Sequence, residues 1–87
     1  MTNEAETTTR AKQVIANWAA VDAKVITLDT RLSRLRSNHT DELRASMNRE
    51  FSGEGDFPIT PPEWDEADPK RVRDVRDLAD KKLGDES

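Results

Sequence analysis

The sequence predicts an all-α protein in which a long N-terminal helix joins one or two shorter helices in a hairpin or bundle. Apolar residues recur at alternating steps of three and four through residues 11–35, the pattern of a coiled-coil seam. Proline and glycine are absent from residues 9–37 and occur only beyond residue 52. A chain of 87 residues with 33% hydrophobic residues and no cysteine buries a modest core alone. We therefore expect oligomerisation to complete the bundle.

The first predicted helix begins near residue 9, after a polar, threonine-rich stretch at residues 1–8 that we expect to be frayed. Its seam positions are the expected interface: Val14, Trp18, Val21, Val25, Leu28, Leu32 and Leu35. Valine at d positions and Trp18 at an a position fit poorly with a parallel two-stranded coil. Ile15 and Ile26 widen the apolar face further. The pattern thus favours the spine of a bundle over a simple zipper.

Residues 9–52 are predicted to form either one long helix with a stutter or a helical hairpin with a break near residues 37–40. The heptad pattern of apolar residues is interrupted there, because its next seam positions are His39 and Glu42. The following apolar positions are Leu43, Met47 and Phe51. We favour the break, which lets a second helix ending near residue 51 fold back on the first.

Residues 53–68 are predicted to be an acidic, proline-containing connector. Gly53 is suited to end the preceding helix. Residues 52–69 contain six acidic and no basic residues, although the whole chain has a net charge of only −4. Thr60 and Glu63 match a capping box, with Pro61 at the first helical position. We therefore expect one helical turn around residues 61–66.

The last predicted helix covers residues 69–83, followed by a tail at residues 84–87. Asp68 is the expected N-cap, Pro69 the first helical residue, and Gly84 the residue just past the end. Its apolar stripe is narrow and the remaining positions are mostly charged. Such a helix is weak alone and needs to dock on the rest of the chain.

The predicted function is that of a small non-enzymatic protein–protein interaction protein, adaptor or regulatory, acting through the first helix. The seam favours a homo-oligomer, with a dimer as the simplest form. The alternative is that the same stripe faces the core of a monomeric bundle. Phe57, Ile59 and Trp64 are candidate partner-binding anchors, because aromatic residues are frequent interface hot spots. The same three residues are also suited to anchor the connector on the first helix.

Two other functions are weighed against this one. The connector is suited to an acidic inhibitor that binds a basic protein. We favour the interpretation that its acidic residues instead balance the charge of the chain's own arginines, within a subunit or across an oligomer. Clusters such as residues 31–36 and 70–76 contain several arginines that suit phosphate binding. Interleaved acids and a pI of about 4.9 make nucleic-acid binding the less favoured alternative.

No catalytic, cofactor or metal site is predicted. The sequence has no cysteine nucleophile, no glycine-rich phosphate loop and only one histidine, His39. The acidic, polar N-terminus differs from a signal peptide. No apolar run approaches the ~20 residues that span a bilayer. We therefore expect a soluble cytoplasmic protein without membrane partners.

Overall fold

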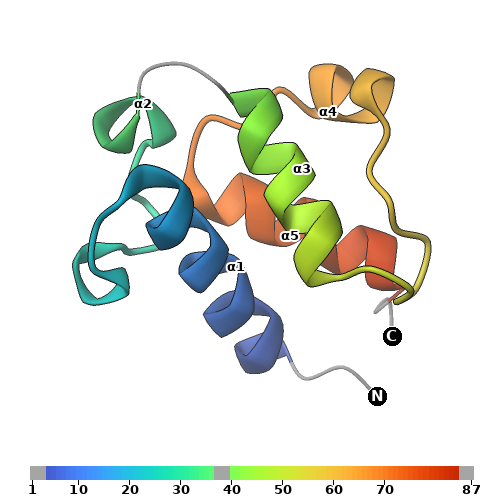
Figure 1. The fold of residues 1–87 in the computed structure, drawn as a ribbon, viewed down its shortest axis with the longest axis horizontal. Helices are drawn as coiled ribbons and strands as arrows, with labels where there is room; N and C mark the ends of the chain where they lie inside the picture. The colour runs from blue at the N-terminus through green and yellow to red at the C-terminus, as the bar shows by residue number, and fades with distance from the viewer. Residues whose placement is uncertain (1–3, 37–39, 85–87) are drawn as a thin grey trace.

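The computed structural model describes residues 4–36 and 40–84, and within those ranges the chain consists of helices and loops without a strand (Figure 1). The helices are α1 (Glu4–Ala19), the short 3-10 helix η1 (Ala23–Val25), α2 (Leu32–Leu35), α3 (Thr40–Glu50), α4 (Pro61–Ala67) and α5 (Val72–Leu83). The all-α class predicted from the sequence is confirmed for these residues.

α1 is the central element, because it packs against both α3 and α5. Ala11 and Ile15 of α1 are fully buried, with Val14 and Trp18 completing a stripe at helical spacing. The other buried residues of the core are Ala16, Ile26, Leu32, Leu43, Met47, Phe51, Ile59, Trp64, Val72, Val75, Leu78 and Ala79. One chain therefore assembles a continuous core of its own.

The predicted uninterrupted helix through residue 37 is corrected by the structure, since α1 ends at Ala19. Ala20 adopts a left-handed conformation with φ of 59°, and the Val21 amide donates back to the Ala16 carbonyl at 3.0 Å. Residues 21–30 are rich in β-branched residues and aspartate, which have low helix propensity. Asp22 instead caps η1 by accepting from the Lys24 amide at 2.9 Å. The apolar spacing continues past Ala19, but the helix does not.

After η1 the chain makes a turn, in which the Thr30 amide donates to the Thr27 carbonyl at 3.1 Å, and then pairs with the residues just before α5. Arg31 and Arg71 form an isolated antiparallel bridge. The Leu32 amide donates to the Lys70 carbonyl at 2.9 Å, and the Val72 amide donates to the Thr30 carbonyl at 3.0 Å. These bonds satisfy backbone groups that a helix would have paired locally. The bridge joins two segments about forty residues apart in the sequence.

The connector contains the predicted capping box. The Thr60 hydroxyl accepts from the Glu63 amide, and the Glu63 carboxylate accepts from the Thr60 amide at 3.1 Å. The resulting helix α4 extends to Ala67. Asp68 then ends α4 in a left-handed conformation with φ of 46°, rather than capping the last helix.

The predicted start of the last helix at residue 69 is also corrected. α5 begins at Val72, because residues 70 and 71 are extended and their backbone is engaged by the bridge. Gly84 ends α5 with φ of 70°, as the sequence predicted. α3 lies where the second helix was expected, while residues 37–39 of the predicted break are outside the described ranges.

Replacing Ala20 with glycine tests the end of α1. Glycine adopts a left-handed conformation without the steric cost that alanine bears. We expect Ala20→Gly to raise the free energy of unfolding by about 0.5–1 kcal/mol, measured by urea denaturation. In a continuous helix the same substitution would lower it by about 1 kcal/mol.

The matched control for this substitution is Ala16→Gly, which lies inside α1 and is expected to destabilise the protein. A loss of stability in Ala20→Gly as large as in the control would contradict the observed turn.

Candidate interaction surface

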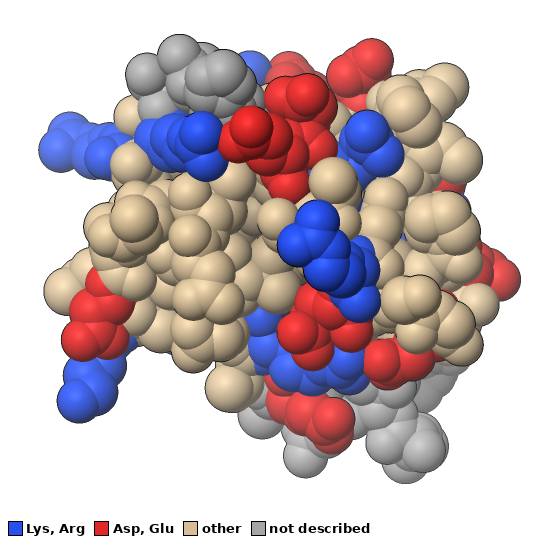
Figure 2. Space-filling model, in the orientation of Figure 1, with Lys and Arg blue, Asp and Glu red and all other residues tan. Residues whose placement is uncertain are grey.

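Two large hydrophobic side chains are exposed in the described part of the chain. Val21 is 36% exposed and Val25 is 64% exposed. Both follow the turn at Ala20, which directs this segment away from the core occupied by α1. Figure 2 shows an uncharged area over the end of α1 and η1, with charged side chains at its margins. Val25 is the last residue of η1, and Val21 lies between α1 and η1.

A half-open groove lies on α1 and α3 beside the end of α1, with a volume of about 450 Å³. Its lining residues are Val14, Asn17, Trp18, Ser46, Arg49 and Glu50. We call this groove, together with Val21 and Val25, the apolar face. Ser46, Arg49 and Glu50 share one side of α3 by their helical spacing. The sequence shows that spacing but not that this side lies next to Trp18.

Trp18 is held in place by Arg36. The Arg36 guanidinium carbon lies 5.6 Å from the centroid of the Trp18 ring, within the range of a cation–π contact. Arg36 also donates a hydrogen bond to the Trp18 carbonyl at 3.1 Å. Its other nitrogen pairs with Glu42 at 2.9 Å. These contacts connect α2 and α3 to the wall of the groove.

The seven predicted seam residues do not form one helical stripe. Val14 and Trp18 line the groove, whereas Val21 and Val25 are exposed in the segment that follows α1. Leu32 is buried in the core, while Leu28 and Leu35 are half-buried against that core. Of the seven predicted interface residues, two therefore line the groove, two are exposed beyond the end of α1, and three pack within the monomer.

The candidate anchors of the connector pack on their own chain. Ile59 and Trp64 are buried in the core. Phe57 stacks on Phe51 with ring centroids 4.9 Å apart. Asn48 of α3 donates to the Ile59 carbonyl at 3.0 Å and accepts from the Ile59 amide at 2.7 Å. These contacts favour the interpretation that the three residues attach the connector to the helices.

Arg10 of α1 binds one acidic residue at the end of α3 and another just beyond it. Its guanidinium pairs with Glu54 at 2.7 Å and with Glu50 at 3.0 Å, and stacks 4.2 Å from the centroid of the Phe51 ring. The hydrogen bond from Arg10 holds the pKa of Glu54 below its ordinary value. The same bond is the main reason that the pKa of Arg10 is raised.

Glu63 of α4 forms a second such contact, an ion pair with Lys82 of α5. The hydrogen bond from Lys82, followed by the bonds from the Thr60 amide and hydroxyl, lowers the pKa of Glu63 to about 2. Asp68 pairs with Lys70 at 3.0 Å. Three of the six acidic residues of the connector therefore contact the chain's own cations, which favours the intramolecular interpretation of its charge.

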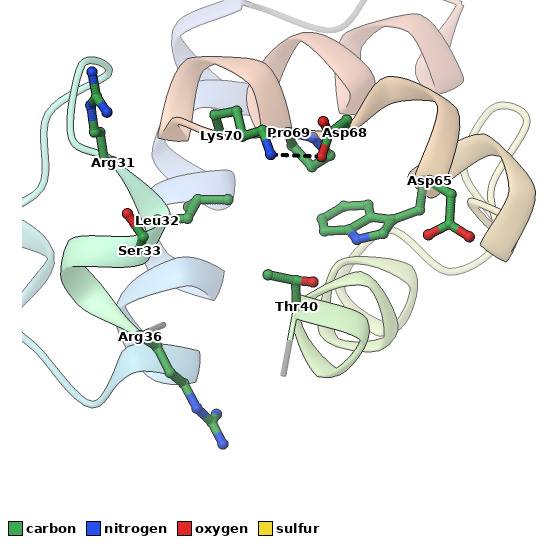
Figure 3. Close-up of a pocket in the computed structure, with 10 residues that line it drawn as sticks. Arg31, Leu32, Ser33, Arg36, Thr40, Asp65, Asp68, Pro69 and Lys70 are labelled. Carbon is green, nitrogen blue, oxygen red and sulfur yellow. Dashed lines mark ion pairs between the residues drawn. The ribbon is translucent and has the colours of Figure 1, made fainter. Parts of the chain in front are cut away.

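A second pocket, of about 530 Å³, lies between α2 and α4 (Figure 3). Its lining residues are Arg31, Leu32, Ser33, Arg36, Thr40, Trp64, Asp65, Asp68, Pro69 and Lys70. Arg31 and Arg36 point outward from it, and Lys70 turns to Asp68 (Figure 3). The charged groups do not converge on one point, so the pocket lacks the geometry of an ion-binding or catalytic site.

The described residues contain no group of three or more histidine, cysteine, aspartate or glutamate side chains that could hold a metal ion. His39 lies outside the described ranges. None of the helices in residues 4–36 and 40–84 has the length and apolar character needed to cross a membrane.

No protein family, curated protein or solved structure matches this chain.

The ion pair of Glu63 predicts a pH-dependent contribution to stability. The pKa of Glu63 is about 2 in the folded chain against an ordinary value of 4.5. Its ionised form therefore stabilises the fold above about pH 4.5, and this stabilisation disappears as the pH falls to about 2. We expect Glu63→Gln, which keeps a capping-box residue, to be less stable than the parent at pH 7.

The difference between Glu63→Gln and the parent should vanish near pH 2 when urea midpoints are compared. Glu66→Gln is the control, because Glu66 is an exposed residue of α4 without an ion pair among the described residues. A difference for Glu63→Gln that stays constant from pH 7 to pH 2 would contradict the assignment.

Proposed function

We propose that the protein is a small non-enzymatic interaction protein that associates with a second copy of itself through the apolar face. The observation that carries this proposal is the exposure of Val25, at 64%, and of Val21, at 36%, in the segment that follows the end of α1 at which Trp18 lines the groove. Single exposed hydrophobic residues are ordinary, but a cluster of them next to a groove is typical of an interaction surface.

A second copy is the occupant that fits the shape of this face. The face combines projecting valines with a groove partly lined by Val14 and Trp18. A two-fold axis brings the same patch of both subunits together, so the valines of one copy face the groove of the other. Arg49 and Glu50 carry opposite charges at the groove. Glu50 already pairs with Arg10 of its own chain at 3.0 Å, so Arg49 is the groove charge that is available to an acidic residue of the second copy.

The energy available from this contact predicts a weak, reversible dimer. Fully burying one valine contributes about 1.5 kcal/mol at the low end of the usual range, and both valines are already partly covered. Association also has to overcome the loss of translational and rotational freedom of one subunit. We therefore expect a dissociation constant in the micromolar range or weaker.

The non-enzymatic part of the proposal rests on the sequence, which lacks a cysteine nucleophile and a glycine-rich phosphate loop. The alternative of an acidic inhibitor has less support, since Glu54, Glu63 and Asp68 already contact cations of the same chain. An inhibitor would have to rely on the remaining carboxylates of the connector.

Sedimentation equilibrium at tens of micromolar tests self-association. We expect the parent protein to show a monomer–dimer equilibrium, and Val21→Ser/Val25→Ser to shift it to monomer. Because both valines are exposed, the double variant should keep its helical circular dichroism and change unfolding free energy by about 0.5 kcal/mol or less per site.

The matched control is Ala45→Ser/Ala67→Ser, which changes two exposed apolar residues elsewhere on the surface. It should dimerise like the parent. A parent protein that stays monomeric throughout the concentration range, or a dimer that the valine substitutions leave unchanged, would refute the proposal.

A further inference from the structure

The antiparallel bridge places two basic segments side by side that lie far apart in the sequence, residues 31–36 and 70–73. The hydrogen bonds that flank the bridge join Leu32 to Lys70 and Val72 to Thr30. Arg31 and Arg71 are therefore a non-hydrogen-bonded antiparallel pair, in which opposed Cα atoms are only about 4.5 Å apart. Both side chains project from the same face of the bridge, so two positively charged side chains originate from neighbouring backbone positions.

Neighbouring cations on the same surface have acidic partners. Arg73 pairs with Asp29 at 2.5 Å, and Lys70 pairs with Asp68 at 3.0 Å. Asp74, three residues after Arg71, accepts from the backbone amides of Lys70 and Arg71 at 3.0 Å each. Its carboxylate is thus engaged by the start of α5.

Three arginines on this surface differ from those neighbours: Arg31, Arg34 and Arg71. Among the described residues no carboxylate lies within 4.0 Å of any of their charged nitrogens. Arg34 is the third residue of α2, and its amide donates to the carbonyl of Arg31, the extended residue before that helix, at 3.0 Å, so the two residues lie within one turn of each other. Figure 3 shows that Arg31 extends away from the pocket and from Lys70. We call these three residues the arginine triad.

Opposed like charges destabilise a bridge unless a counter-charge lies between them. The guanidinium fork matches the oxygens of a phosphate group and binds them in a bidentate manner. The triad stands on an open surface, which suits a chain of phosphates better than an enclosed free anion. α2 is a single turn, too short to enter the major groove of a duplex as a recognition helix does.

We propose that the arginine triad binds the phosphate backbone of a single-stranded nucleic acid. The net charge of −4 repels a nucleic acid overall, so binding depends on the local positive charge of this surface. The site is separate from the apolar face, and its occupancy does not depend on self-association. The proposed contacts are to the phosphate backbone alone and involve no stacking of bases.

Fluorescence anisotropy with a labelled single-stranded RNA oligonucleotide tests this site on the full chain. Each phosphate contact contributes about −0.7 to the slope of log affinity against log salt for single strands, so three contacts give about −2. Affinity should then fall about 20-fold between about 50 and 200 mM salt. Arg31→Gln/Arg34→Gln/Arg71→Gln should abolish binding at the lower salt concentration.

The matched control is Lys12→Gln/Lys24→Gln/Lys81→Gln, which removes three positive charges from other parts of the surface. It should keep most of the affinity, and circular dichroism should show both variants folded. Absence of binding by the parent at low salt, or an equal loss in both variants, would overturn the proposal. Equal competition by polyglutamate would show that phosphate is not recognised. Tighter binding to a duplex of the same sequence would contradict the single-stranded assignment.

Discussion

The left-handed backbone at Ala20 is the constraint on which the rest of the structure depends. A continuous helix over residues 4–35 would be about 48 Å long at 1.5 Å per residue. The molecule measures only 31 Å along its longest axis. By ending α1 at Ala19, the turn allows residues 26–32 to run back beside α5 and to bury Ile26 and Leu32 in the same core as α1.

The same turn creates both proposed surfaces. It leaves Val21 and Val25 outside the core at the end of α1, where they extend the Trp18 groove into the apolar face. It also brings Arg31 opposite Arg71, which no continuous helix would do. A small chain with few apolar residues thus uses them mainly for one core, and leaves a short segment to present an apolar and a basic surface.

Local signals in the sequence predicted the elements whose chemistry is local. The Thr60 capping box, the glycine end of α5 and the amphipathic spacing of α1 each depend on residues within one or two turns. The prediction of one helix through residue 37 was wrong, because apolar spacing indicates which residues are buried but not which backbone conformation buries them. The low helix propensity of residues 21–30 was the opposing signal. No local sequence signal predicts the bridge between Arg31 and Arg71, so the arginine triad could be identified only from the structure.

Nuclear Overhauser spectroscopy across the bridge tests this account most directly. In a non-hydrogen-bonded antiparallel pair the two α-protons face each other, so a strong cross-peak is predicted between the α-protons of Arg31 and Arg71. The amides of Leu32 and Val72 should also exchange slowly, because both are hydrogen-bonded across the bridge. Unbroken helical amide–amide contacts from Ala19 to Arg31, without the cross-peak, would contradict the account.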